Sequence, residues 1–252
     1  MPQERHLEAQ ILAQAVEANL SDQVDDVEAI AVDVNTDLGK IVQGKADEVS
    51  VAGEGLVIQQ DIRVQELEMH AQAVAINPIS ALFGKIKLEQ PLDTVMRVVL
   101  TEADLNQTLN SEAIRQYLFP WELNVDGKIA TIELQQPMKL RLLAGGKMQF
   151  IGNLLRKEDN QEQRTHFSAV MLPRTEDQPV LLEEFRCQPG QGLPFGLTFA
   201  VFEKMRVLLE QPYLKWEEMT FRVQSLEVQE GSMVLHLEAY VYQIPDLGTD
   251  AL

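Results

Sequence analysis

The chain has 252 residues, of which 45% are hydrophobic and 24% are charged, and its formal net charge is −18. This composition is typical of a folded soluble protein with one large domain or two small ones, and no run of about 18 apolar residues indicates a membrane-spanning helix. The acidic excess disfavours nucleic acid as a partner, because phosphate backbones would be repelled. The single cysteine, Cys187, excludes an internal disulfide.

The first predicted element is an amphipathic helix over residues 3–20. Apolar residues recur there at helical spacing, among them Leu12 and Val16, and acidic residues occupy the first turns, where the helix dipole favours them. The segment lacks the basic start and the continuous apolar run of a secretory signal, which predicts a cytoplasmic protein unless a leader has been removed.

Strands with alternating apolar residues are predicted next. Ile30, Val32 and Val34 share one face of a strand, and strand-like segments continue to Ile76. This alternation predicts a sheet with one apolar face and one polar face.

The stretch NPISALFGK at 77–85 interrupts the strands, because Asn-Pro and Gly are turn signals. Its three large apolar residues form one turn of apolar surface: Ile79, Leu82 and Phe83. A second helix is predicted over 101–118, with Thr101 as N-cap and Asp104 completing an approximate capping box.

A meander of strands is predicted between residues 121 and 190, with turn signals at Asp126-Gly127 and Gly145-Gly146. The helix predicted over 197–211 is the most apolar of the three and is apolar on several sides. Because helices do not alternate with strands, we expect an α+β fold in which a long, strongly twisted antiparallel sheet wraps around amphipathic helices.

A short phrase occurs twice, as IRVQELEM at 62–69 and FRVQSLEV at 221–228. The apolar residues of each copy are spaced by two, three and two residues. Steps of two keep side chains on one face of a strand, whereas a step of three switches the face unless a β-bulge absorbs one residue. Each copy therefore predicts a bent strand in a curled sheet, and chance similarity of two amphipathic strands is the alternative.

Catalytic signatures are scarce. The four histidines are far apart and none has a second ligand at metal-site spacing, and the serine-hydrolase elbow and the phosphate loop are both absent. We therefore predict no metal, no cofactor and no enzymatic activity, with a lipid hydrolase assembled from distant residues as the open alternative.

The stretch 39–91 resembles the LmeA-like phospholipid-binding family through VSVAGEGLVIQ, RVQELEM and AINPISALFG, and the later segments VVLTEADLN and SLEVQEGSMVLHL also fit. The resemblance extends over most of residues 27–240. It implies a single lipid-binding domain over 1–252, with a fold similar to the tubular lipid-binding (TULIP) proteins, in which a twisted sheet cradles a long helix. It also implies a bacterial protein that binds or carries phospholipid.

The leading hypothesis is non-enzymatic binding, extending to transport, of phospholipid or another acyl lipid in an apolar groove between sheet and helices. The turn at 79–83 is expected to act as a flap at the mouth of the groove or as a patch for peripheral membrane contact. The alternative is a protein-interaction module that uses that patch or a strand edge. The candidate lipid-binding residues are Leu12, Val16, Ile79, Leu82, Phe83, Phe199, Phe202 and Met205.

Overall fold

The computed structural model describes residues 17, 26–58, 62–77, 80, 87–112, 120–125, 127–158, 161–173, 180–188, 190, 192–209, 213–216 and 218–243. Twelve strands and three helices are defined in this part of the chain. In order they are β1 (Ala29–Asn35), α2 (Leu38–Ile41), β2 (Lys45–Ile58), β3 (Ile62–Ala75), β4 (Leu92–Thr101), α4 (Glu102–Leu109), β5 (Trp121–Val125), β6 (Lys128–Leu143), β7 (Lys147–Glu158), β8 (Gln161–Leu172), β9 (Leu181–Cys187), α6 (Phe195–Leu209), β10 (Tyr213–Trp216), β11 (Met219–Gln229) and β12 (Ser232–Val241).

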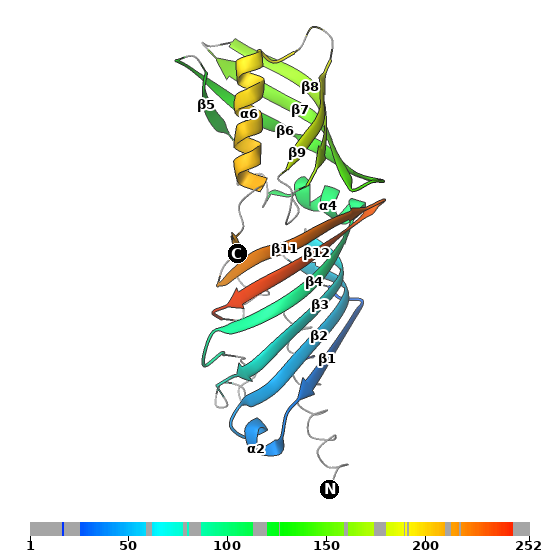
Figure 1. Cartoon of the computed structure of the whole chain (residues 1–252), viewed down its shortest axis with the longest axis vertical. Coiled ribbons are helices and arrows are strands. Elements are labelled where there is room, and N and C mark those ends of the chain that lie inside the picture. Colours follow the sequence, from blue (N-terminus) through cyan, green and yellow to red (C-terminus); the bar gives the residue numbers. More distant parts are fainter. Residues whose placement is uncertain are drawn as a thin grey trace. The chain divides into compact units, whose positions relative to one another are not determined.

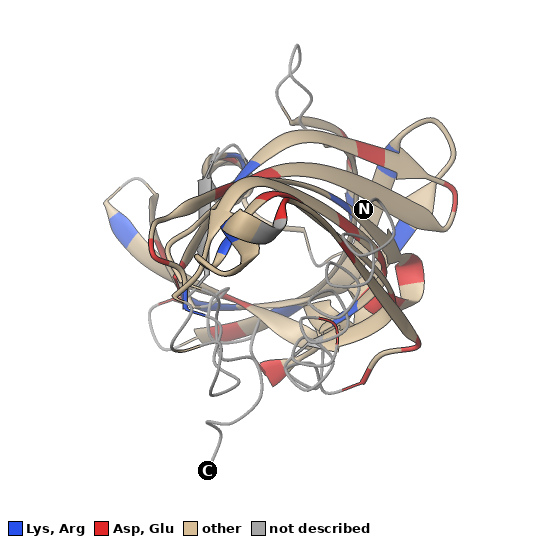
Figure 2. Ribbon diagram, turned by 90° about the horizontal axis from the view of Figure 1, so that it is seen from below, with Lys and Arg blue, Asp and Glu red and all other residues tan. Residues whose placement is uncertain are grey.

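These elements form two compact units. Unit 1 comprises Met1–Leu100, Pro212–Ser225 and Val234–Leu252, and unit 2 comprises Thr101–Gln211 and Leu226–Met233. The pairings along β1 to β4, along β5 to β9 and between β10 and β11 are antiparallel, and the strands are long, twisted and curved (Figures 1 and 2). The expected α+β class, dominated by a curled antiparallel sheet with few helices, is confirmed.

Unit 1 is built on a seven-stranded sheet in the order β1-β2-β3-β4-β12-β11-β10 (Figure 1). The first four strands follow one another along the chain, apart from α2 between β1 and β2, and the C-terminal hairpin then pairs with β4. The predicted helix over 3–20 and the predicted apolar turn at 79–83 belong to this part of the sequence but, apart from residues 17 and 80, lie outside the described residues.

The first copy of the repeated phrase lies in β3, and its apolar residues stay on one face of the sheet across the step of three. Val64 is buried before the step, and Leu67 packs in the same apolar cluster three residues later. The pairing of β2 with β3 keeps one offset on both sides of Gln65, so no register shift accompanies this step. The extra residue of β3 is matched by one in β2, where Gly55 has a φ of 61° that only glycine adopts readily.

Unit 2 is built on a five-stranded sheet in the order β5-β6-β7-β8-β9, with α6 lying against it (Figure 1). Leu197 and Val201 of α6 pack with buried residues of β5 to β8 in one core. Helix α6 begins two residues before its predicted start.

Helix α4 covers part of the edge of β6. The predicted cap is present, since Thr101 and Asp104 form a reciprocal capping box. The helix was predicted to run on to residue 118, but α4 ends at Leu109 with Asn110 as its C-cap, and residues 113–119 lie outside the described residues. Strand β5 pairs only with residues 128–132, so within the part of the chain that the structure describes the rest of this edge of β6 has no strand partner. Asn106 accepts from Leu140 N–H and donates to Leu140 C=O, both at 2.8 Å.

Asn110 makes the same pair of bonds with Met138, and Glu102 accepts from Leu142 N–H at 2.8 Å. Three side chains spaced four residues apart on one helix thus take the place of a neighbouring strand. This arrangement hides backbone groups that an exposed sheet edge would offer to other chains.

Candidate apolar lipid-binding face

The seven-stranded sheet of unit 1 has one face made almost entirely of apolar side chains. The register aligns residues of β1 to β4 in three rows across the sheet, which we call the apolar face. The rows are Ile30–Gly53–Leu67–Val98, Val32–Val51–Met69–Met96 and Val34–Val49–Ala71–Thr94. None of these positions is charged, and they arise because alternating residues of a strand point to the same side.

The opposite face of the same strands carries seven polar side chains, four of them acidic, among five apolar ones. Its rows, which we call the polar face, are Ala29–Glu54–Glu66–Val99, Ala31–Ala52–Glu68–Arg97 and Asp33–Ser50–His70–Val95. The two faces therefore suit opposite partners: water and cations on the polar face, and hydrocarbon on the apolar face.

The apolar face continues onto β12 and β11. Thr94 donates its hydroxyl to the backbone carbonyl of Ala239 at 3.3 Å, which joins β4 to β12. Ala71 and Ala239 are each only 2% exposed and share a cluster with larger residues. The other members of that cluster are Leu92, Val241, Val74, Leu88, Met96, Met219 and Phe221.

Along β2 and β3, the apolar face continues beyond the row that contains Gly53 and Leu67. Leu56 and Val64 pair directly and pack with Val98. The side chain of Leu56 lies over Gly53, where an added Cβ would come within 2.8 Å of it. Glycine at position 53 therefore leaves room for the large side chain of Leu56 on the apolar face.

A hollow of about 710 Å³ lies on the other side of this sheet, over β3, β4, β12 and β11. Its lining includes His70, Asp93, Arg222 and Glu238, and the last two form an ion pair at 3.6 Å. Charged walls suit a polar molecule and would have to be desolvated to hold an acyl chain. The apolar face is thus the better candidate for binding hydrocarbon.

The described residues hold no group of three His, Cys, Asp or Glu side chains placed to bind a metal ion. None of the helices in the same part of the chain is both long and apolar enough to cross a bilayer.

Most of the residues predicted from sequence to bind lipid cannot be placed on this face. Leu12, Val16, Ile79, Leu82 and Phe83 lie outside the described residues. The other three lie on α6 of unit 2: Phe199, Phe202 and Met205.

Among these three, Phe199 is 60% exposed, whereas Phe202 packs edge-on against Phe185 at a ring-centroid distance of 5.1 Å. The side chain of Met205 is outside the described set. Their role in lipid binding stays a prediction. The sequence analysis predicted the residues of the apolar face as strand residues and did not include them among the lipid-binding candidates. Their alternating apolar pattern was the signal that could have identified them.

Comparison with curated proteins and with solved structures gives no match. A family model does match, over residues 5–238, and this range extends across both compact units. The match confirms the resemblance carried by the segments between residues 39 and 91. The chain therefore belongs to the LmeA-like phospholipid-binding family.

Proposed function

We propose that this protein binds phospholipid without catalysing a reaction, and that the acyl chains lie against the apolar face of unit 1. The observation that carries the proposal is the set of three uncharged cross-strand rows, on a sheet whose other face is acidic. Membership of a family described as phospholipid-binding supports the same assignment.

The dimensions of the face suit an acyl chain. The eleven residues of β2 from Ala46 to Leu56 are ten steps long, or about 33 Å at the usual rise of a strand. One leaflet of a bilayer core is about 15 Å thick, so a lipid chain can lie along the face without leaving it. Each methylene removed from water contributes about 0.8 kcal/mol, which gives a long chain ample driving force.

The curled antiparallel sheet also supports a relation to the TULIP fold, in which a sheet wraps around a helix. In this proposal, helices of the chain complete the wall of the groove opposite the apolar face. Carrying lipid between membranes, rather than only holding it, is the extension of the same proposal.

Mass spectrometry of gently purified protein tests the proposal, since co-purifying phospholipid is expected. Val32 and Ala31 provide a matched pair, because they are neighbours on β1 that belong to the apolar face and the polar face. Val32→Asp should reduce bound lipid by about tenfold or more, since a carboxylate placed against methylenes must be desolvated. Ala31→Asp should leave bound lipid unchanged.

Circular dichroism establishes that both variants fold. A lipid-free wild-type protein that also takes up no phospholipid when offered it would rule out the proposal. Equal lipid content in folded Val32→Asp and Ala31→Asp would show that the lipid binds elsewhere.

A further inference from the structure

The structure describes six basic side chains of unit 1, and four of them form ion pairs with acidic neighbours. These pairs are Lys40 with Asp47, Arg63 with Glu28, Arg97 with Glu66, and Arg222 with Glu238. Among the unit 1 side chains that the structure describes, Lys45 and Lys87 have no acidic partner. Both are exposed, so their charges are available to a ligand.

The two free lysines lie at the same end of the sheet, on either side of the end of β3. Lys45 pairs with Ala75, and the carbonyl of Lys87 accepts from Asn77 N–H at 2.7 Å. With two strand spacings between them and an offset of two residues, their Cα atoms are about 12 Å apart. Both residues lie on the same face of this ladder, so their flexible side chains can approach one anionic surface together.

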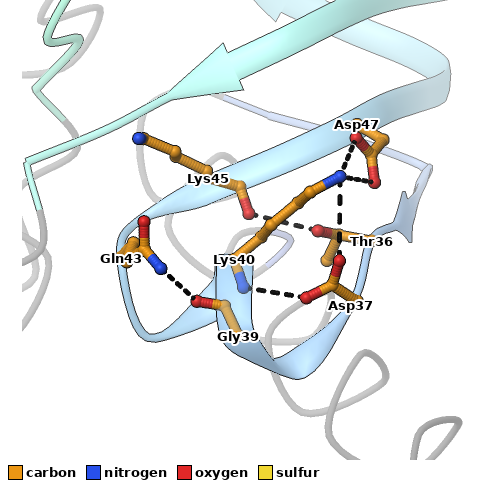
Figure 3. Close-up of polar contacts among 7 residues, drawn as sticks. All are labelled: Thr36, Asp37, Gly39, Lys40, Gln43, Lys45 and Asp47. Carbon is orange, nitrogen blue, oxygen red and sulfur yellow. Dashed lines mark hydrogen bonds and ion pairs between the residues drawn. The ribbon is translucent and has the colours of Figure 1, made fainter.

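The neighbouring turn presents an apolar residue beside these charges. Val42 follows α2 and is 80% exposed. Lys40 does not add to the free charge, because its ammonium group lies 2.6 and 2.9 Å from the two carboxylate oxygens of Asp47 and 3.7 Å from Asp37 (Figure 3). The hydrogen bond to Asp47 raises the pKa of Lys40. Lys45, by contrast, points away from this cluster (Figure 3).

The same end of the sheet borders the apolar surface. Ile76 bridges to Leu88, and Leu88 and Val74 pack against the cluster that contains Ala71 and Ala239. An acyl chain that leaves a membrane at this end would therefore meet apolar side chains at once.

We propose that this end of unit 1, formed by Val42, Lys45 and Lys87, docks on the phosphate layer of a phospholipid bilayer. The inference rests on the proposed function and adds where the lipid enters. Unit 1 contains nine basic and 22 acidic residues, a net charge of −13, so most of its surface is repelled by an anionic membrane. Salt screens charges beyond about 8 Å, so the residues nearest the lipid decide the docking orientation.

Glu89 supplies a test of opposite sign. It is exposed and lies two residues from Lys87, and its backbone N–H donates to the carbonyl of Ala75 at 2.9 Å. Its carboxylate offsets part of the positive charge at this end. Removing it should strengthen docking, whereas removing either lysine should weaken docking.

Flotation of the full chain with vesicles rich in phosphatidylglycerol measures docking. Lys45→Gln and Lys87→Gln should each weaken association about fivefold, and the double variant about 25-fold, because each basic residue near an anionic surface contributes about 1 kcal/mol. Glu89→Gln should strengthen association, and added salt should weaken it for the wild type. Lys139→Gln, which changes an exposed and unpaired lysine of unit 2, is the matched control and should leave association unchanged.

Uptake of a monomeric short-chain phosphatidylcholine separates this inference from the proposed function. Uptake by the double lysine variant should equal that of the wild type, since the apolar face is intact. Loss of uptake would show that the lysines hold the headgroup of the bound lipid, which overturns the docking role. Wild-type vesicle binding by both lysine variants would also overturn it, whereas failure of the wild type to take up lipid would instead count against the proposed function.

Discussion

Replacing Thr165 by valine is expected to stabilise unit 2. Thr165 lies in β8 and is completely inaccessible to solvent, and its hydroxyl has no hydrogen-bond partner. It pairs with Leu154, which belongs to the core that packs against α6. The hydroxyl has therefore lost its bonds to water and gained none in the folded protein.

The magnitude follows from two effects. A buried polar group without a partner costs about 1–3 kcal/mol of stability, and valine removes that penalty while keeping the branched shape. The methyl group that replaces the hydroxyl adds roughly 0.8 kcal/mol of apolar burial, part of which is offset by its larger size. The net expected gain in the free energy of unfolding is about 1–2 kcal/mol.

Urea unfolding followed by tryptophan fluorescence measures this gain. Trp121 is half-buried against the same core, and a Trp216→Phe background makes it the sole reporter. The unfolding midpoint should rise by about 0.5–1 M, given the usual dependence of stability on urea. Thr165→Ser is the control, because it keeps the hydroxyl and deletes a buried methyl group, and its midpoint should fall.

A valine variant that is less stable than the wild type would refute this reasoning, most clearly if the serine variant were as stable as the wild type. That pair of results would mean that the hydroxyl makes an interaction worth more than the methyl group.

Three further changes test other parts of the structure. Asn106→Ala should lower stability by about 1–3 kcal/mol in urea unfolding, because it leaves an N–H and a C=O of the β6 edge without partners. Gly55→Ala should destabilise by about 1–2 kcal/mol more than Gly127→Ala in the same assay: both glycines have positive φ, but an added Cβ would lie 2.5 Å from a side-chain carbon at Gly55 and would have nothing within 4 Å at Gly127. Asp47 raises the pKa of Lys40, so this pair stabilises the fold fully at pH values below the pKa of an unfolded-state lysine, and the stabilisation is lost as the pH rises through the pKa of Lys40 in the folded protein. Asp47→Asn should therefore lower the pKa of Lys40 in an NMR titration.

Local signals in the sequence predicted much of the backbone. The capping box at Thr101 and the turn at Gly145-Gly146 were predicted because each depends on residues within a few positions of one another. The apolar rows of unit 1 were implicit in the alternation of Ile30, Val32 and Val34. Alternation gives the face of a strand without giving its neighbours, so it predicted an apolar face but not which strands share it.

Features that join distant segments were not predicted. The amides of Asn106 and Asn110 looked like ordinary polar positions of a helix, although their spacing of four residues places them on one side. Only the fold shows that this side meets the unpaired edge of β6, about 30 residues further along the chain. The same limit applies to the step of three in β3, because the residue that matches it is Gly55 on another strand.

The two copies of the repeated phrase show what a step of three between apolar residues accomplishes. In β3 this step is matched by Gly55 in β2, so the pairing continues unchanged and both halves of the strand belong to unit 1. In β11 the same spacing places Phe221 in an apolar cluster of unit 1, whereas the compact units divide between Ser225 and Leu226, at the step of three. A strand with strict alternation would offer apolar side chains to one side along its whole length. The step of three, matched by Gly55 in β2, achieves the same in β3, because Val64 before the step and Leu67 after it pack in one apolar cluster.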